Sequence, residues 1–292
     1  MPIYETKRGA RLAIRNGGAH PFIATLALSV FSAVMLILGM RASGIQTFLG
    51  YSQKQFTEIT ASVAAGDVGS VQAAIDSGEF RERFVSEFRR TFSPAGFALM
   101  TVLQLFVMIA EFGASWYWLR LASGEKAKWT SLFACFQRAG ALLLLLLYTE
   151  LLVLLWTLPF IAACAAFGFL AVRFSAPALS GVSILFACAG MVAAVVANLR
   201  YAFAVFIMHD NPEFRVAECV RQSVRLIRGN KGRLFLLKLS FIGWYVLAGI
   251  VAAYLGFDVL ALWITPYAGI SVAVFYLFLR NTPTAELESM YE

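Results

Sequence analysis

Six long apolar segments, separated by shorter polar ones, dominate the pattern of residues along this chain. A hydrocarbon core of ~30 Å needs about 20 apolar residues in a helix to cross it. The pattern therefore predicts an all-α fold, a polytopic membrane helical bundle with six transmembrane helices and amphipathic interfacial helices. The predicted transmembrane helices lie near residues 22–40, 95–119, 140–169, 178–199, 236–256 and 259–279.

Composition supports an integral membrane protein. Hydrophobic residues make up 60% of the 292 residues and charged residues only 14%, which differs from a soluble globular domain. The net charge of +7 is compatible with nucleic-acid binding, but the basic residues lie in short segments beside apolar runs and form no recognisable reading module. We therefore expect membrane lipids, and no nucleic acid, as partners.

The distribution of Lys and Arg between the spans predicts the topology. Basic residues are concentrated in segments 1–21, 120–139 and 200–238, whereas the loop 170–177 carries only one. Cytoplasmic loops carry an excess of Lys and Arg. We therefore expect a cytoplasmic basic N-terminus at residues 1–21, a five-span membrane bundle over 95–280 and a cytoplasmic tail at 281–292, with both termini in the cytoplasm.

The segment 41–94 balances its acidic and basic residues, and this neutrality permits export. We expect an extracytoplasmic helical segment of two or three helices, broken near residues 66–69 and at Ser77–Gly78. Two interpretations stay open for it. It is either a short helical cap on the outer leaflet or a ligand-binding ectodomain.

Residues 211–229 form the most distinctive polar segment, a predicted cytoplasmic amphipathic helix directly before the fifth span. Asp210 or Asn211 can cap its start, Pro212 suits its first turn, and Gly229 suits its end. Such a helix fits the interface between acidic headgroups and acyl chains. Its basic side carries Arg221, Arg225 and Arg228, and its apolar side carries Phe214, Ala217, Val220, Val224 and Ile227.

A second in-plane helix is expected in the loop 120–139. Its aromatic and aliphatic residues, from Trp129 to Phe136, recur at helical spacing between basic residues. Aromatic rings flanked by lysines commonly anchor a segment at the membrane interface.

The basic end of the 211–229 helix is a candidate binding surface. Cations at a membrane surface each contribute about 1 kcal/mol of attraction to an anionic leaflet. Three interpretations stay open: topology signalling alone, binding of an anionic lipid, and docking of a membrane-protein partner. The candidate contacts for lipid or partner are Arg221, Arg225, Arg228, Lys231 and Arg233.

Glu111 and Glu150 lie inside apolar runs and are candidate intramembrane polar residues. A charge at mid-membrane costs roughly 2.5–3.5 kcal/mol on insertion scales, so such a carboxyl normally faces the bundle interior, is paired or is protonated. Arg120 and Tyr148 are possible partners. The two carboxyls either hydrogen-bond to neighbouring helices for structural reasons or line an ion or proton path, in which case both should share a polar cavity.

No motif in the chain indicates enzymatic chemistry. The sequence contains no Gly-x-Ser-x-Gly elbow, no Walker loop and no Gly-x-Gly-x-x-Gly fingerprint. His20 and His209 are its only histidines, and its four cysteines include no Cys-x-x-Cys pair, so no metal site can be assembled locally. We predict no catalytic residues, no metal and no cofactor.

Several motifs after residue 200 carry a family resemblance. They are Asp-x-Pro at 210–212, Arg-Gly-Asn-Lys at 228–231, Leu-Ser-Phe-Ile-Gly-Trp at 239–244 and Pro-Tyr at 266–267. The chain resembles an uncharacterised bacterial integral-membrane family, domain of unknown function 975, most clearly over residues 200–280. The resemblance implies a multi-pass protein of the bacterial plasma membrane with no assigned activity.

Two functional hypotheses follow from the sequence. The first is a non-enzymatic membrane protein whose basic cytoplasmic face engages anionic lipid or a membrane partner. The second is a small-solute or ion transporter or channel that uses Glu111 and Glu150 within the membrane.

Overall fold

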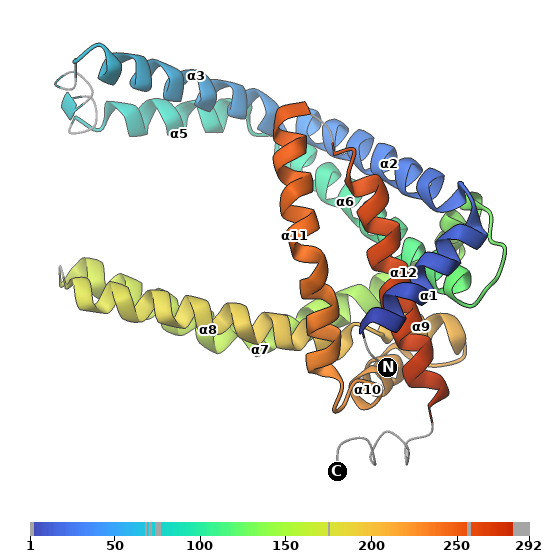
Figure 1. Ribbon diagram of the computed structural model, residues 1–292. Helices are drawn as coiled ribbons and strands as arrows, with labels where there is room; N and C mark the ends of the chain where they lie inside the picture. Colours follow the sequence, from blue (N-terminus) through green and yellow to red (C-terminus); the bar gives the residue numbers. More distant parts are fainter. Residues whose placement is uncertain are drawn as a thin grey trace. The chain divides into compact units, whose positions relative to one another are not determined.

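Helices are the only regular secondary structure in the part of the chain that the structure describes (Figure 1). This computed structural model describes residues 3–67, 69, 72–73, 77–174, 176–255 and 258–282. In chain order the helices are α1 Ile3–Gly17, α2 His20–Ser43, α3 Ile45–Ala64, α5 Glu79–Thr91, α6 Pro94–Ala122, the 3-10 helix η1 Trp129–Arg138, α7 Ala139–Arg173, α8 Pro177–Tyr201, α9 Ala204–Asp210, α10 Val216–Leu226, α11 Lys231–Leu255 and α12 Ala261–Asn281.

Among the described residues, six helical stretches are long and apolar enough to cross a membrane, which confirms the predicted fold class. Two of the stretches join consecutive helices, η1 with α7 and α8 with α9. The fifth begins at Lys231 rather than at residue 236, because long basic side chains at a helix end can extend toward water while the helix continues. The six stretches are His20–Ser43, Pro94–Ala122, Trp129–Ala171, Ala178–Asp210, Lys231–Leu255 and Ala261–Asn281.

The chain divides into two compact units. The smaller unit is Ala27–Met108, and the larger unit combines Met1–Leu26 with Ile109–Glu292. All the candidate site residues belong to the larger unit.

In the smaller unit, α3 and α5 pack against each other through aromatic rings. The ring centroid of Phe48 lies 4.8 Å from that of Phe84 and 5.2 Å from that of Phe88, both edge-on. Gly78, with φ +73°, precedes α5 at the predicted break, and Gly66, with φ +84°, follows α3. Within the predicted break near 66–69, residue 68 lies outside the described residues.

In the larger unit, α7 and α8 lie side by side along most of their lengths (Figure 1). The Ser183 hydroxyl donates to the Cys164 carbonyl at 2.9 Å, which fixes the two helices in register. The N-terminal helix α1, for which the sequence predicted only a basic segment, packs against α12. A Cβ on Gly9 would lie 3.2 Å from the side chain of Val274, so the two helices approach closely.

The predicted in-plane helix before α7 exists, but as the 3-10 helix η1. It packs against α6 at Gly113, where a Cβ would lie 2.3 Å from the Cys135 sulfur and 2.5 Å from the Leu132 carbonyl oxygen. The Cys135 thiol also lies 3.6 Å from the Ile109 carbonyl oxygen of α6 and can donate to it. Only a residue without a side chain fits this contact.

The amphipathic segment predicted over 211–229 begins later than expected. Helix α10 starts at Val216, and the Arg215 N–H donates to the Glu218 carboxylate at 3.1 Å. Asp210 cannot cap α10 because its carboxylate is bound elsewhere, and Pro212 lies in the preceding turn. The predicted end is close to the observed one, since Gly229 has φ +82°.

We predict that Gly113→Ala destabilises the protein, whereas the matched variant Gly243→Ala does not. The added methyl at Gly113 would overlap η1, and overpacking of this kind costs about 1–3 kcal/mol. No atom outside its own helix lies within 4 Å of a Cβ at Gly243, and Ala is favoured over Gly in a helix by about 0.5–1 kcal/mol. Thermal unfolding in detergent, followed by tryptophan fluorescence, measures the unfolding midpoint of each variant. Equal midpoints for the two variants would contradict the close packing of η1.

Candidate functional site

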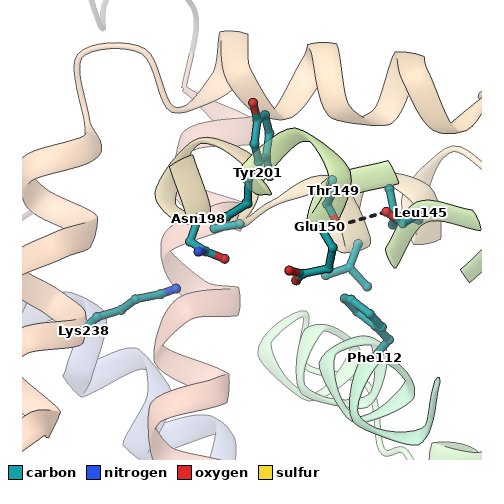
Figure 2. Close-up of a pocket in the computed structure, with 11 residues that line it drawn as sticks. Phe112, Leu145, Thr149, Glu150, Asn198, Tyr201 and Lys238 are labelled. Carbon is teal, nitrogen blue, oxygen red and sulfur yellow. Dashed lines mark hydrogen bonds between the residues drawn. The ribbon is translucent and has the colours of Figure 1, made fainter. Parts of the chain in front are cut away.

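A pocket of about 190 Å³ opens in the larger unit, with walls from α6, α7, α8, α9 and α11 (Figure 2). Most of its lining is apolar, including Phe112 of α6 and Val153 of α7. Its polar lining residues are Thr149, Glu150, Asn198, Tyr201 and Lys238. Because these residues come from helices far apart in the sequence, the pocket exists only in the folded chain.

Two of these lining residues carry opposite charges. Figure 2 shows the Lys238 amine and the Glu150 carboxyl pointing into the same space, with the Asn198 amide between them. The structure records neither an ion pair nor a hydrogen bond for Glu150 or Lys238 within the described residues. The pocket therefore holds an acid and a base that do not neutralise each other by direct contact.

Glu111, the other predicted intramembrane carboxyl, does not line this pocket. It is exposed on α6, one residue before the lining residue Phe112. Arg120, expected from the sequence as a partner for these carboxyls, instead pairs with Glu125 at 2.8 Å, because the chain turns back directly after α6. The structure therefore does not bring Glu111 and Glu150 into one pocket.

The predicted basic residues lie on α10 and at the start of α11. Arg221, Arg225 and Arg228 are exposed, while Lys231 and Arg233 are partly buried. In the described part of the chain, no ion pair is recorded for the three exposed arginines. We call Arg221, Arg225 and Arg228 the basic face.

The opposite side of α10 packs inside the protein. Cys219, Ser223 and Ile227 are fully buried, so part of this side meets protein and not the acyl chains expected there. The Ser223 hydroxyl donates to the Arg200 carbonyl at 2.9 Å and accepts from the Phe203 N–H at 3.2 Å. The sequence shows that α10 has an apolar side. Because an apolar side fits both a protein interior and a lipid interface, the sequence does not distinguish between them.

Asp210 joins α9 to α12. Its carboxylate accepts hydrogen bonds from the Tyr276 hydroxyl at 2.7 Å and from the Arg280 guanidinium at 2.5 Å. The His209 ring nitrogen lies 3.4 Å from the other carboxylate oxygen. Because each polar group has a partner, this cluster serves to hold the two helices together.

Sequence reasoning missed Lys238 and Asn198 as site residues. Lys238 was counted with the cytoplasmic loop, although a cation two residues inside an apolar run can indicate a polar site in a membrane. It also missed that Arg8, Arg11 and Arg15 are exposed on a helix that packs on α12. The helical spacing of Thr6 and Ala10, both buried, was the available signal for α1.

The described residues contain no group of three or more His, Cys, Asp or Glu side chains that could hold a metal ion. The six apolar stretches and the helical architecture define a multi-pass membrane protein.

Comparison with known sequences assigns the chain to a family. It belongs to the family described as protein of unknown function (DUF975), whose profile matches residues 78–282. The match begins well before residue 200, so it includes the pocket and the basic face as well as the C-terminal motifs. None of the curated proteins and none of the solved structures searched is similar enough to count as a match.

The buried side of α10 predicts an unreactive thiol at Cys219. Burial raises the pKa of the Cys219 thiol, and only the thiolate reacts readily with maleimide. In a variant that keeps Cys219 as its only cysteine, alkylation at neutral pH in detergent should be slow until the protein is denatured. Adding Gln222→Cys, an exposed position on the same helix, should restore rapid labelling. Rapid labelling of native Cys219 would contradict the packing of α10 inside the protein.

Proposed function

We propose that this protein is a non-enzymatic membrane protein whose basic face binds the headgroups of anionic lipids. The proposal includes the topology predicted from the loop charges, with both termini in the cytoplasm of a bacterial plasma membrane. In this arrangement α10 lies at the inner surface of the membrane, directly before α11 enters it. Lys231 and Arg233 at the start of α11 supply further contacts.

The single observation that carries this proposal is the exposure of the three arginines of the basic face. The burial of Cys219 and Ser223 on the opposite side of α10 prevents the helix from rotating, so the guanidinium groups stay directed outward. Exposed guanidinium groups that form no intramolecular ion pair are free to bind phosphate, often through two parallel hydrogen bonds. Topology signalling alone does not require a helix held in one orientation.

The N-terminal helix carries a second set of exposed basic residues. Arg8, Arg11 and Arg15 are exposed on α1, which packs against α12 in the same unit as α10. The surface potential of an anionic leaflet attracts each such cation by about 1 kcal/mol. Two basic helices in one unit therefore favour a lipid surface as the ligand.

The transporter hypothesis requires one polar cavity that contains both Glu111 and Glu150. The pocket contains only Glu150. Glu111, which is exposed like Glu150, is absent from the lining of the pocket. A path that uses both carboxyls finds no support in the arrangement of the described residues. Lipid binding at the basic face is therefore the better-supported function.

Neutralising the basic face should weaken binding of anionic lipid. We expect the triple variant Arg221→Gln, Arg225→Gln and Arg228→Gln to lose about 3 kcal/mol of attraction, roughly a hundredfold in the dissociation constant for phosphatidylglycerol. Native mass spectrometry of the detergent-solubilised protein, titrated with phosphatidylglycerol, measures this constant. Because surface charges are screened by salt, the difference between wild type and variant should shrink as ionic strength rises.

The matched control removes three exposed arginines from α5: Arg81→Gln, Arg89→Gln and Arg90→Gln. Its net charge equals that of the first variant, so bulk charge effects are the same. We expect its binding of phosphatidylglycerol to stay close to that of wild type. Unchanged binding in the first variant, or equal loss in both, would refute a lipid site at the basic face.

A further inference from the structure

The pocket at Glu150 has a property that the basic face lacks, because it presents both signs of charge. Glu150 comes from α7 and Lys238 from α11, and both side chains reach the same pocket (Figure 2). Among the described residues that line it, they are the only charged ones. No direct contact between them is recorded in the described part of the chain, so each can face a ligand of opposite charge.

Such an arrangement is costly within a span unless something occupies it. Both residues lie inside helical stretches that are long and apolar enough to cross a membrane. Charged groups in such segments usually pair with one another or with a counter-charge in a cavity. Because Glu150 and Lys238 do not pair, a molecule that carries both a cation and an anion would compensate both at once.

The neighbouring polar groups fit such a ligand. One N–H of the Asn198 amide donates to the Ala194 carbonyl at 2.9 Å, which fixes the amide and leaves its second N–H and its oxygen available. The Thr149 hydroxyl donates to the Leu145 carbonyl at 2.9 Å, so its oxygen can still accept. The Tyr201 hydroxyl points away from the charged groups (Figure 2), and this residue contributes only to the wall.

We propose that this pocket binds a small zwitterionic group, with its ammonium at Glu150 and its anionic end at Lys238 and Asn198. A volume of about 190 Å³ suits a headgroup or a small solute. The apolar walls at Phe112 and Val153 suit the hydrocarbon part of such a ligand.

The ligand could come from two sources that share this chemistry. Asn198 lies in the last turn of α8, and Lys238 lies two turns into α11, so the pocket is near one end of these helices. At that level it can receive the headgroup of an ethanolamine phospholipid from the surrounding leaflet, or a water-soluble zwitterion such as an amino acid. The experiment below separates the two sources.

The lipid arm compares phosphatidylethanolamine with phosphatidylglycerol, titrated separately into the full-length protein in detergent and followed by native mass spectrometry. Wild type should bind phosphatidylethanolamine at the pocket, in addition to the phosphatidylglycerol that the basic face holds. We expect Glu150→Gln and Lys238→Gln each to weaken phosphatidylethanolamine binding about tenfold or more, because each leaves one ligand charge without a partner. Glu111→Gln and Lys126→Gln, which remove the same charges outside the pocket, should leave it unchanged.

The solute arm uses glycerophosphoethanolamine and alanine with delipidated protein. A ligand that binds only the folded state raises the unfolding temperature with its concentration. Stabilisation by glycerophosphoethanolamine together with retention of phosphatidylethanolamine identifies a lipid headgroup. Stabilisation by alanine without retention of phosphatidylethanolamine identifies a soluble zwitterion.

Three outcomes would overturn the proposal. One is the absence of both phosphatidylethanolamine binding and thermal stabilisation in wild type, which would leave a pocket that holds only water. The second is weaker ligand binding in Lys238→Gln together with unchanged binding in Glu150→Gln, which would define a simple anion site. The third is that the control variants lose as much ligand binding as the pocket variants. Because titrations of wild type alone can give the first outcome, the proposal stays testable even if a variant fails to fold.

This inference is independent of the proposed function. The basic-face variant of Arg221, Arg225 and Arg228 should keep its affinity for the zwitterionic ligand while losing affinity for phosphatidylglycerol. The charge-exchanged variant Glu150→Lys with Lys238→Glu should recover part of the zwitterion binding lost in either single variant, because the pocket again holds one charge of each sign.

Discussion

The two hydrogen bonds of Ser223 connect both candidate sites of this protein. A break between helices leaves backbone groups without their usual partners, and the hydroxyl of Ser223 satisfies the Arg200 carbonyl and the Phe203 N–H at the break between α8 and α9. Residues beside this break, among them Ala202 and Ala204, form part of the pocket wall. Because Ser223 is fully buried on α10, the same contact orients the basic face outward.

The six spans were predictable because a single physical quantity determines them. A helix that crosses hydrocarbon needs a long apolar run, and each predicted run overlaps a helical stretch that meets this requirement. The aromatic contact of α5 with α3 was also visible in part, since Phe84 and Phe88 recur at helical spacing. Features that follow from the local order of apolar residues can therefore be predicted from this sequence.

Features that depend on distant partners could not be predicted in this way. Asp210 has the residue type and position of a helix cap, yet Tyr276 and Arg280 bind its carboxylate, so α10 begins later. Likewise, the apolar side of α10 was compatible with lipid, and only the burial of Ile227 shows that it packs inside the protein. The pocket is a stronger case, because its charges come from α7 and α11 and no local pattern connects them.

The difference between the two candidate sites is one of charge balance and not of total charge. The basic face holds cations on a solvated helix, where attraction is additive, weakened by salt and indifferent to the rest of the ligand. The pocket holds one exposed charge of each sign beside largely apolar walls, where a ligand charge without a partner is costly and recognition becomes selective. An anion alone would leave Glu150 unpaired beside it, and a cation alone would leave Lys238 unpaired. The same physical principle therefore assigns general anionic surfaces to α10 and a ligand with both charges to the pocket.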